Sequence, residues 1–540
     1  MIRYIRGLSL CTAGTFFVVC AFVSASVAQD IKLRMKGSTY EITGKLQVYT
    51  EKQYVIELPS VGIINLDADR FDCISENCPT VSNTNIRTNA LREVNPRSIQ
   101  GGITIAGSNA IGNSLMPALV EAFAEKNGFR IQKEIATTPR DTKIKISDSA
   151  NREVATVDLR GLGTSTSFKA LETGRADVSM SSRRIRPAEV DSLGRAGLGD
   201  MLSPTYEHVL GLDGLVVIVA EDNPAVSIPL DKLAAVLSGK IRDWSQLGLP
   251  PGAINVYAPD DDSGTFDTIN KLILRPANTI IASTARRISN HKQLSDQVAG
   301  DPLGIGIVGI AYQRNAKILN VEMACGLIMQ PSVFAMKTEE YPLTRRLFLY
   351  TPSRARVPLA RALVAFALSG EAQPIVKAAK FIDQSPDSIS FKDQGSRIAH
   401  ALNAPNEDFD LSLMQALIKE LKDAVRLTTT LRFKVGAAAL ENKARQDIAR
   451  LVGGLKNGAY AGRQIMLLGF ADSAGGFPNN LVLAQNRADA VRAELLRVGG
   501  SDLQPERIVS KGYGELAPVA CNLVEDGGRF FNRRVEVWVR

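Results

Sequence analysis

Short apolar segments alternate with amphipathic segments of helical period between residues 103 and 383, and this alternation restricts the fold more than any other feature. The first such pair is the apolar run 103–106 and the amphipathic stretch 115–126. Strands that alternate with helices along the sequence are typical of α/β domains, in which helices cover a sheet. We therefore predict an α/β domain over residues 98–390 of this 540-residue chain.

The regions on either side have different patterns. Residues 29–80 alternate apolar and polar side chains in short runs that glycines interrupt, which predicts a small all-β module. Residues 427–540 carry segments in the order strand, helix, strand, helix, strand, strand (βαβαββ), which predicts a compact α+β domain. Polar residues predict a linker at 81–97, and a linker followed by a helix at 391–426. The predicted fold class is therefore multidomain.

The first 28 residues have the pattern of a secretory signal peptide. Arg3 and Arg6 precede an apolar stretch without charges, and small residues stand immediately before Gln29. An uncleaved membrane anchor is the alternative, because about 20 apolar residues are long enough to span a bilayer. With either interpretation we expect the rest of the chain to lie in an exported compartment.

Cysteines can form disulfide bonds in an exported compartment. Cys73 and Cys78 are separated by a loop that is long enough to close, so we predict a disulfide bond between them. Cys325 and Cys521 lie in different predicted domains, and for these two residues we expect isolated thiols.

Charge and histidine content exclude several classes of function. The net charge of +8 comes from 64 basic and 56 acidic residues, and the basic residues form no long run, so we predict no nucleic-acid partner. The three histidines, His208, His291 and His400, are far apart and fit no metal-binding spacing. We therefore predict no metal, no cofactor and no catalytic residue.

Four turns of the α/β region bring glycine and hydroxyl residues to the start of a predicted helix or the end of a strand. They are residues 107–110, 163–167, 181–184 and 263–265. A helix start presents unpaired N–H groups and about half a positive charge, which suits an anion, and Arg183 can add a bidentate contact. Ordinary helix caps are the alternative for each turn taken alone. Together the four turns favour an oxyanion site.

In this order, and followed by the glycine-rich segment 304–309, the motifs resemble the phosphate-binding proteins of high-affinity phosphate ABC transporters over about residues 100–385. The resemblance implies a periplasmic binding protein of type II-like fold, in which two lobes close on an oxyanion about a hinge. It also implies phosphate as the ligand and allows an ABC permease as a partner. By position, the ligand would contact Ser108, Asn109, Thr164, Ser165, Ser182, Arg183, Ser263, Gly264 and Thr265.

One position departs from this family. Pro259 stands where the family usually has an arginine, four residues before the serine of the Ser-Gly-Thr turn, and three aspartates follow it. Three adjacent carboxylates would repel a phosphate dianion, so we expect the run 260–262 to face water. A different oxyanion is the alternative ligand.

The last region resembles the OmpA-like peptidoglycan-binding domain over about residues 427–540. The resemblance rests on Asp472 after a predicted strand, on Asn480 and Arg487 in the following helix, and on the Asn-Arg-Arg motif at 532–534. It implies that Asp472 and Arg487, assisted by Asn480, hold the zwitterionic end of diaminopimelate in the cell-wall peptide. A surface salt bridge between Asp472 and Arg487 is the alternative.

These features predict a periplasmic solute-binding protein that is associated with the cell wall and outer membrane, binds phosphate and is not an enzyme. Two alternatives stay open. The first is a structural peptidoglycan-associated protein with a degenerate ligand cleft, which Pro259 favours. The second is a phosphoester hydrolase, for which the sequence offers no metal cluster and no activated nucleophile.

Overall fold

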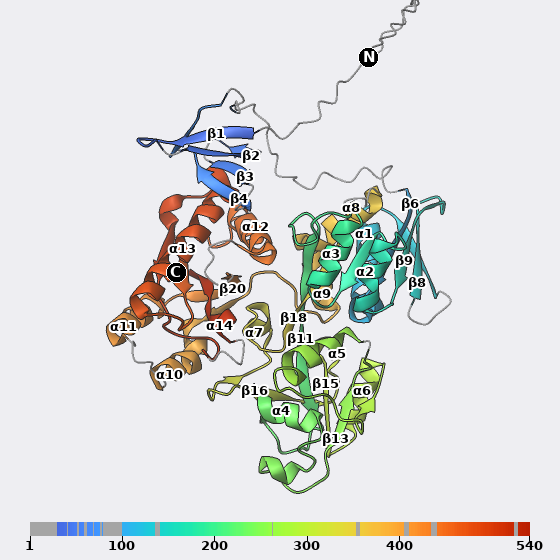
Figure 1. Cartoon of the computed structure of the whole chain (residues 1–540). Helices are drawn as coiled ribbons and strands as arrows, with labels where there is room; N and C mark the ends of the chain where they lie inside the picture. Colours follow the sequence, from blue (N-terminus) through green and yellow to red (C-terminus); the bar gives the residue numbers. More distant parts are fainter. Residues whose placement is uncertain are drawn as a thin grey trace, which may run out of the picture. The chain divides into compact units, whose positions relative to one another are not determined.

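The structure is a computed structural model of the chain, drawn in Figure 1. It describes residues 30–39, 41–50, 53–58, 62–68, 70–75, 78, 100–135, 141–261, 263–352, 357–403, 410–433, 440–522 and 528–540. The chain divides into two compact units, Met1–Arg92 and Glu93–Arg540. The predicted signal peptide and the predicted linker at 81–97 lie outside the described residues.

The first unit contains a five-stranded antiparallel sheet with the strand order β4-β3-β2-β1-β5. Its strands are β1 (Asp30–Met35), β2 (Glu41–Thr50), β3 (Gln53–Leu58), β4 (Gly62–Asp67) and β5 (Phe71–Cys73). Ile31 and Leu33 alternate with exposed residues along β1 and form a small core with Ile56, because successive side chains of a strand point to opposite faces. Cys73 and Cys78 form a disulfide bond.

The second unit begins with an α/β domain of two lobes. The first lobe holds the strands β6 (Gly101–Gly107), β7 (Arg130–Ile135), β8 (Asp141–Ser147), β9 (Glu153–Arg160) and β10 (Val178–Ser181). Its helices form two layers: α1 (Met116–Lys126), α8 (Pro358–Leu368) and α9 (Gln373–Ala378) share one apolar core with the sheet, and α2 (Thr164–Glu172) and α3 (Pro187–Arg195) share another. The strands are therefore covered on both faces.

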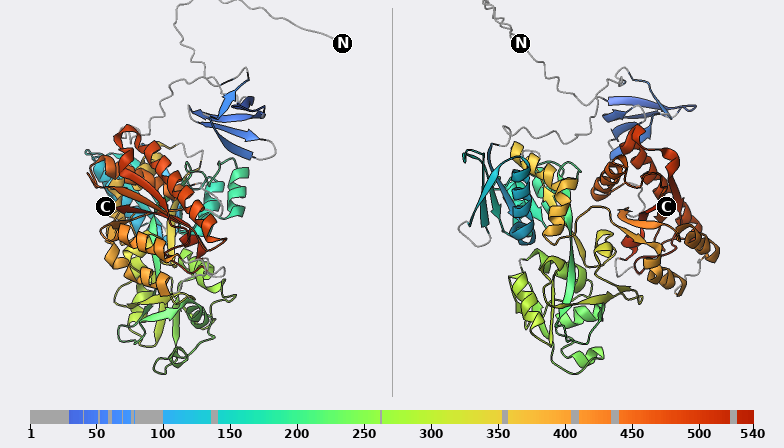
Figure 2. Two further views of the ribbon diagram at one scale, coloured as in Figure 1. Left: turned by 90° about the vertical axis from the view of Figure 1, so that its left-hand side faces the viewer. Right: turned by 180° about the vertical axis from the view of Figure 1, so that it is seen from behind.

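Two strands, β11 (Glu207–Val219) and β18 (Thr344–Tyr350), lie where the lobes join (Figures 1 and 2). The first half of β11 pairs with β18, and the second half pairs with β15 (Gly304–Gly309) of the second lobe. One mixed sheet therefore runs through both lobes in the order β14-β13-β15-β11-β18-β10-β6-β9-β8-β7. Nearly every residue of β11 is buried, which explains its long apolar sequence.

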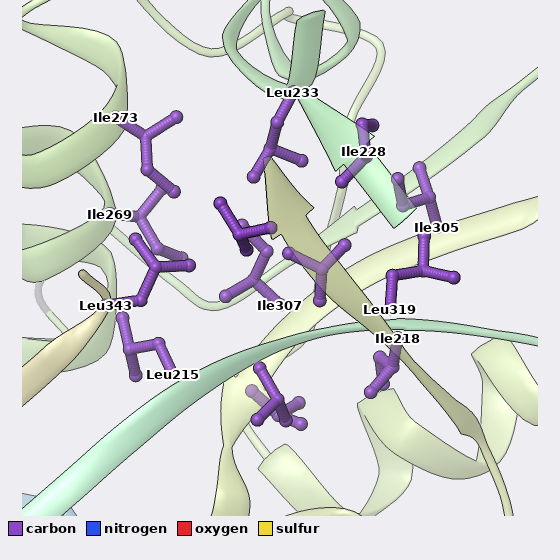
Figure 3. Packing of buried hydrophobic residues seen from close by; sticks show 14 of the residues in the cluster. Leu215, Ile218, Ile228, Leu233, Ile269, Ile273, Ile305, Ile307, Leu319 and Leu343 are labelled. Atoms are coloured by element: carbon purple, nitrogen blue, oxygen red, sulfur yellow. The ribbon is translucent and has the colours of Figure 1, made fainter. Parts of the chain in front are cut away.

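The second lobe comprises residues 214–344. Its other strands are β12 (Ser227–Pro229), β13 (Asn255–Ala258), β14 (Arg286–Arg287), β16 (Lys317–Glu322) and β17 (Ile328–Met329), and its helices are α4 (Leu230–Leu237), α5 (Gly264–Ile269), α6 (His291–Ala299) and α7 (Val333–Lys337). Figure 3 shows the core of this lobe, where Leu233 of α4, Ile307 of β15 and Leu319 of β16 point toward one another. This core holds α5 against the sheet.

The C-terminal domain of the second unit is a five-stranded sheet with helices on both faces. The strand order is β19-β20-β23-β21-β22, with β19 (Ser388–Ser390), β20 (Val425–Arg432), β21 (Ile465–Phe470), β22 (Ile508–Gly512) and β23 (Arg534–Val539). Helices α12 (Asn442–Lys456) and α13 (Phe477–Gly499) pack on one face, and α10 (Gly395–Asn403) and α11 (Leu411–Leu421) pack on the other. A short helix, α14 (Arg529–Asn532), precedes β23.

Within residues 391–426, which we expected to be a linker and a helix, α10 and α11 form this second helical layer. Met414 and Leu417 of α11 are buried against Met466 and Trp538 of the sheet. The apolar face of α11 therefore completes the C-terminal domain.

Among the described residues no single helix is long and apolar enough to cross a membrane. The consecutive segments Pro358–Leu368 and Gly370–Ala378 have the length and apolar composition of a membrane span only when taken together, and they are bent by 69° relative to each other.

Cys325 and Cys521 form a disulfide bond, so the expectation of two isolated thiols was wrong. Cys325 follows β16 in the second lobe, and Cys521 lies between β22 and α14 in the C-terminal domain. The two cysteines are 196 residues apart in the sequence, but the packing of the two domains brings their Cα atoms within 5.8 Å.

The C-terminal domain also contacts both lobes through polar side chains. Asn442 of α12 donates hydrogen bonds to Glu207 of the first lobe, 3.0 Å from Nδ2 to Oε1, and to the carbonyl of Leu202. Buried Arg426 of β20 forms an ion pair with Glu340 of the second lobe. The C-terminal domain is therefore packed against both lobes of the α/β domain.

Candidate functional site

A cavity of about 480 Å³ lies between the two lobes. Four helical segments begin at its walls: the segment that leads into α1, followed by α2, α5 and α6. The first two belong to one lobe and the last two belong to the other. Because each helix start carries unpaired N–H groups and a partial positive charge, their meeting at one cavity suits an anion.

Five of the nine residues predicted to bind the anion line this cavity: Ser108, Asn109, Ser263, Gly264 and Thr265. Ser108 and Thr265 are almost completely buried. Oδ1 of Asn109 is buried and has no hydrogen-bond partner among the described residues. Both lobes thus contribute predicted residues to the cavity wall.

Three of the other predicted residues lie outside the cavity lining. The hydroxyl groups of Thr164 and Ser182 are 3.1 Å apart and form a buried hydrogen bond. Gly264 of the opposite lobe packs against both, and a Cβ atom built on Gly264 would lie 2.0 Å from Oγ of Ser182. Thr164 and Ser182 therefore form a contact between the lobes, while the side chain of Ser165 is exposed.

Arg183, the remaining predicted residue, is occupied by carboxylates of the protein. Its Nη1 and Nη2 atoms lie 2.8 and 2.7 Å from the two carboxylate oxygens of Glu189, and its Nε atom lies 2.9 Å from Oδ2 of Asp267. Burial alone would lower the pKa of Arg183, but the two carboxylates raise it. Arg186 also pairs with Asp267, at 2.8 Å. Since Asp267 belongs to α5 of the second lobe, this cluster is an ionic contact between the lobes.

We expected the aspartate run 260–262 to face water, and the two described members of the run differ in this respect. Asp260 lines the cavity, Asp261 is exposed and pairs with Arg287, and Asp262 lies outside the described residues. Nη1 of Arg287 donates to the carbonyl of Pro259 at 2.8 Å. A cation is therefore close to Pro259, but Arg287 is not among the residues that line the cavity.

The start of α6 adds residues that the sequence analysis missed. Asn290 caps this helix, and Asn290, His291 and Lys292 all line the cavity together with Tyr312. Burial, assisted by Arg345, lowers the pKa of His291 to about 4, so its imidazole is neutral at pH 7. Nδ1 of His291 has no hydrogen-bond partner within the described ranges. The sequence signal was Ser-Asn before a helix, which resembles the other turns.

Arg345 of β18 ties the start of α5 to the two strands that join the lobes. Its guanidinium lies 2.6 Å from Oδ2 of Asp213, and it donates to the carbonyl of Gly264 and to Oγ1 of Thr265, each at 2.9 Å. Burial raises the pKa of Asp213, and Arg345 opposes this rise. Two of the cavity residues are therefore held by the same buried arginine.

The second candidate site surrounds Arg487 in the C-terminal domain. Arg487 is completely buried, and its Nη1 atom donates a long 3.4 Å hydrogen bond to the carbonyl of Phe470. Nε and Nη2 of Arg487 have no hydrogen-bond partner in the described part of the chain. Burial lowers the pKa of Arg487, and the nearby charge of Asp472 opposes this effect. A buried guanidinium with two unpaired donors is suited to a carboxylate ligand.

Asp472 lies near Arg487 but pairs with other arginines. Oδ2 of Asp472 is 3.0 Å from Nε of Arg529 and 2.9 Å from Nη1 of Arg533. Asn480 is buried and donates to Glu515 at 2.9 Å. The alternative of a surface salt bridge between Asp472 and Arg487 does not describe these residues, since both side chains are buried and the salt bridges of Asp472 are made with Arg529 and Arg533.

Comparisons with known proteins agree with the division into an α/β domain and a C-terminal domain. A family model described as a PBP superfamily domain matches residues 93–371, and the OmpA family model matches residues 432–530. The chain is 29% identical over 267 residues to Protein SphX of Synechococcus elongatus, which covers 46% of this chain and 74% of that protein. It is 22% identical over 225 residues to Phosphate-binding protein PstS of Borreliella burgdorferi, which covers 41% of this chain and 77% of that protein.

Among solved structures, an ABC-type phosphate transport receptor from Vibrio cholerae matches with a TM-score of 0.39 and 20% identity, over 52% of this chain and 99% of that chain. Because the first family model covers more than half of the sequence, the chain belongs to the PBP superfamily. Its C-terminal region is an OmpA family domain. Both family resemblances found in the sequence are confirmed.

Proposed function

We propose that this protein is an exported solute-binding protein that holds phosphate or a related oxyanion between its two lobes and is anchored to peptidoglycan by its C-terminal domain. The observation that carries the proposal is the convergence of four helix starts, two from each lobe, on one cavity. The name of the PstS relative supports phosphate as the anion. An ABC permease would be the partner that receives the ligand, and the periplasm would be the compartment.

The cavity can replace the hydration shell of an oxyanion with fixed donors. Ser108, Ser263 and Thr265 supply hydroxyl groups beside the helix starts, and Lys292 supplies a positive charge. Hydrogen bonds to a charged group contribute about 1.5–3 kcal/mol each. Because the donors come from both lobes, one bound anion would stabilise the closed arrangement of the lobes.

Phosphate binding is tested by calorimetry on the mature full-length chain. We expect Ser108→Ala to weaken phosphate binding at least about tenfold, since it removes a hydroxyl group from the cavity wall. Ser165→Ala is the matched control, because Ser165 is exposed and does not line the cavity, and it should bind like the wild type. Absence of phosphate and sulfate binding by the wild type at millimolar concentration would favour the alternative of a degenerate cleft.

The wall attachment rests on Arg487, Asp472 and Asn480. Two buried N–H groups of Arg487 lack a partner within the described residues, and the carboxylate of diaminopimelate can accept hydrogen bonds from both. The carboxylate of Asp472 lies near Arg487 and can attract the ammonium group of the same ligand. The site therefore offers an unpaired guanidinium to the carboxylate of the zwitterion, and the ammonium group would share Asp472 with Arg529 and Arg533.

Cosedimentation with purified sacculi tests this attachment. Arg487→Ala should lower binding at least about 30-fold, because a ligand carboxylate left without its partner costs about 2–5 kcal/mol. Arg497→Ala is the matched control, since Arg497 is exposed on the same helix and, among the described residues, forms its ion pair with Glu494 of that helix. Wall binding that survives Arg487→Ala in a folded protein would contradict the proposed anchor.

A further inference from the structure

The cavity between the lobes is larger than an inorganic oxyanion needs. A tetrahedral oxyanion has five heavy atoms. If each takes roughly the 30 Å³ that one water molecule occupies in the liquid, the anion needs at most about 150 Å³. The cavity has about 480 Å³, which lies in the range of sites for small organic molecules.

This volume is not a result of separated lobes, because the lobes already touch at the margins of the cavity. Gly264 packs against Ser182 of the opposite lobe, as described above. The hydroxyl group of Tyr312 donates to the carbonyl of Ala110 across the lobes at 3.3 Å. Asp267 pairs with Arg183 and Arg186, so the contact is ionic as well as steric. Further closure would have to break or compress these contacts.

The residues that line the cavity provide hydrogen-bond acceptors as well as donors. Asp260 contributes a carboxylate, which repels a bare anion but accepts hydrogen bonds from hydroxyl groups. Oδ1 of Asn109 is a buried acceptor without a partner in the described chain. Thr142 and Asn290 add further polar groups to the wall. A ligand that carries hydroxyl groups in addition to an anionic group matches both sets.

We propose that the cavity binds a phosphate monoester of a small polyol, with the phosphoryl group at the helix starts beside Ser108 and Thr265 and the hydroxylated part against Asp260. This inference rests on the proposed function, since it assigns the organic part of the ligand to the same site. Pro259 in place of the family's arginine fits this inference, because Asp260 lines the cavity next to this position and Arg287, the cation near Pro259, does not.

The test is calorimetry of the mature full-length protein with glycerol 3-phosphate, inorganic phosphate and glycerol. We expect glycerol 3-phosphate to bind at least about tenfold more tightly than phosphate, and glycerol to show no measurable binding. Asp260→Ala should weaken binding of glycerol 3-phosphate at least about fivefold and leave phosphate binding unchanged or tighter. Asp261→Ala is the matched control, because Asp261 is exposed and pairs with Arg287, and it should change neither affinity.

The outcomes separate this inference from the proposed function. Equal or tighter binding of phosphate relative to glycerol 3-phosphate would overturn the inference and leave the proposed oxyanion function standing. An equal loss of both ligands in Asp260→Ala would also overturn it. If neither ligand binds to the wild-type protein, both the inference and the assignment of phosphate to the proposed function fail.

Discussion

Breaking the disulfide bond between Cys325 and Cys521 should uncouple the C-terminal domain from the α/β domain. The bond closes a loop between residues that are 196 positions apart. For a loop of this length the chain-entropy contribution is about 5 kcal/mol, which is comparable with the whole unfolding free energy of many domains. Buried ion pairs such as Arg426 with Glu340 stay in place, so we expect a loss of about 2–4 kcal/mol. Two separate unfolding transitions should replace one.

The assay is differential scanning calorimetry of the double variant Cys325→Ser/Cys521→Ser, which leaves no unpaired thiol at this site. The control is Cys73→Ser/Cys78→Ser, because that bond spans only 5 positions and lies in the first unit. We expect the control to leave the main transition of the second unit unchanged. An unchanged midpoint and a single transition in the Cys325/Cys521 double variant would refute the coupling, as would titration of two free thiols at these positions in the wild type.

Two further predictions concern the lobe contact and acid stability. Gly264→Val should weaken ligand binding and lower the melting temperature, because the valine side chain would collide with Ser182. The control Gly194→Ala should change both quantities little, because the space around Gly194 is open. Equal behaviour of the two variants would argue against the lobe contact. Burial would raise the pKa of Glu339, but Arg346 and other cations lower it from the usual 4.5 to about 2. Glu339 therefore stabilises the folded state fully above pH 4.5, and about 3 kcal/mol of this stabilisation is lost between about pH 4.5 and 2. The free energy of unfolding of Glu339→Gln should accordingly depend less on pH in this range than that of the wild type.

The family assignments could be made from the sequence because their motifs are short and local. Ser263, Gly264 and Thr265 are adjacent in the chain and form a helix start by themselves, so their role needs little tertiary information. The same is true of Asn480 and Arg487, which are seven residues apart and therefore lie on one face of a single helix. Local chemistry of this kind is visible before the fold is known.

Other features depend on contacts between distant segments. Arg183 has the right chemistry for an anion, but Asp267, which comes from the other lobe, pairs with it. The bond between Cys325 and Cys521 requires the packing of two domains. The second helical layer of the C-terminal domain does have a sequence signal: every residue of β21 is buried, and its unbroken apolar sequence indicates a sheet covered on both faces.

The central claim is that one molecule attaches to the cell wall and binds an anion at the same time. The most direct test mixes the mature protein with purified sacculi and ³²P-labelled phosphate or glycerol 3-phosphate, and measures protein and label in the pellet. We predict that both sediment together with the wild type, that Arg487→Ala leaves both in the supernatant, and that Ser108→Ala sediments with less label. Sedimentation of the wild-type protein without label, or label bound to wild-type protein that stays in the supernatant, would contradict the claim.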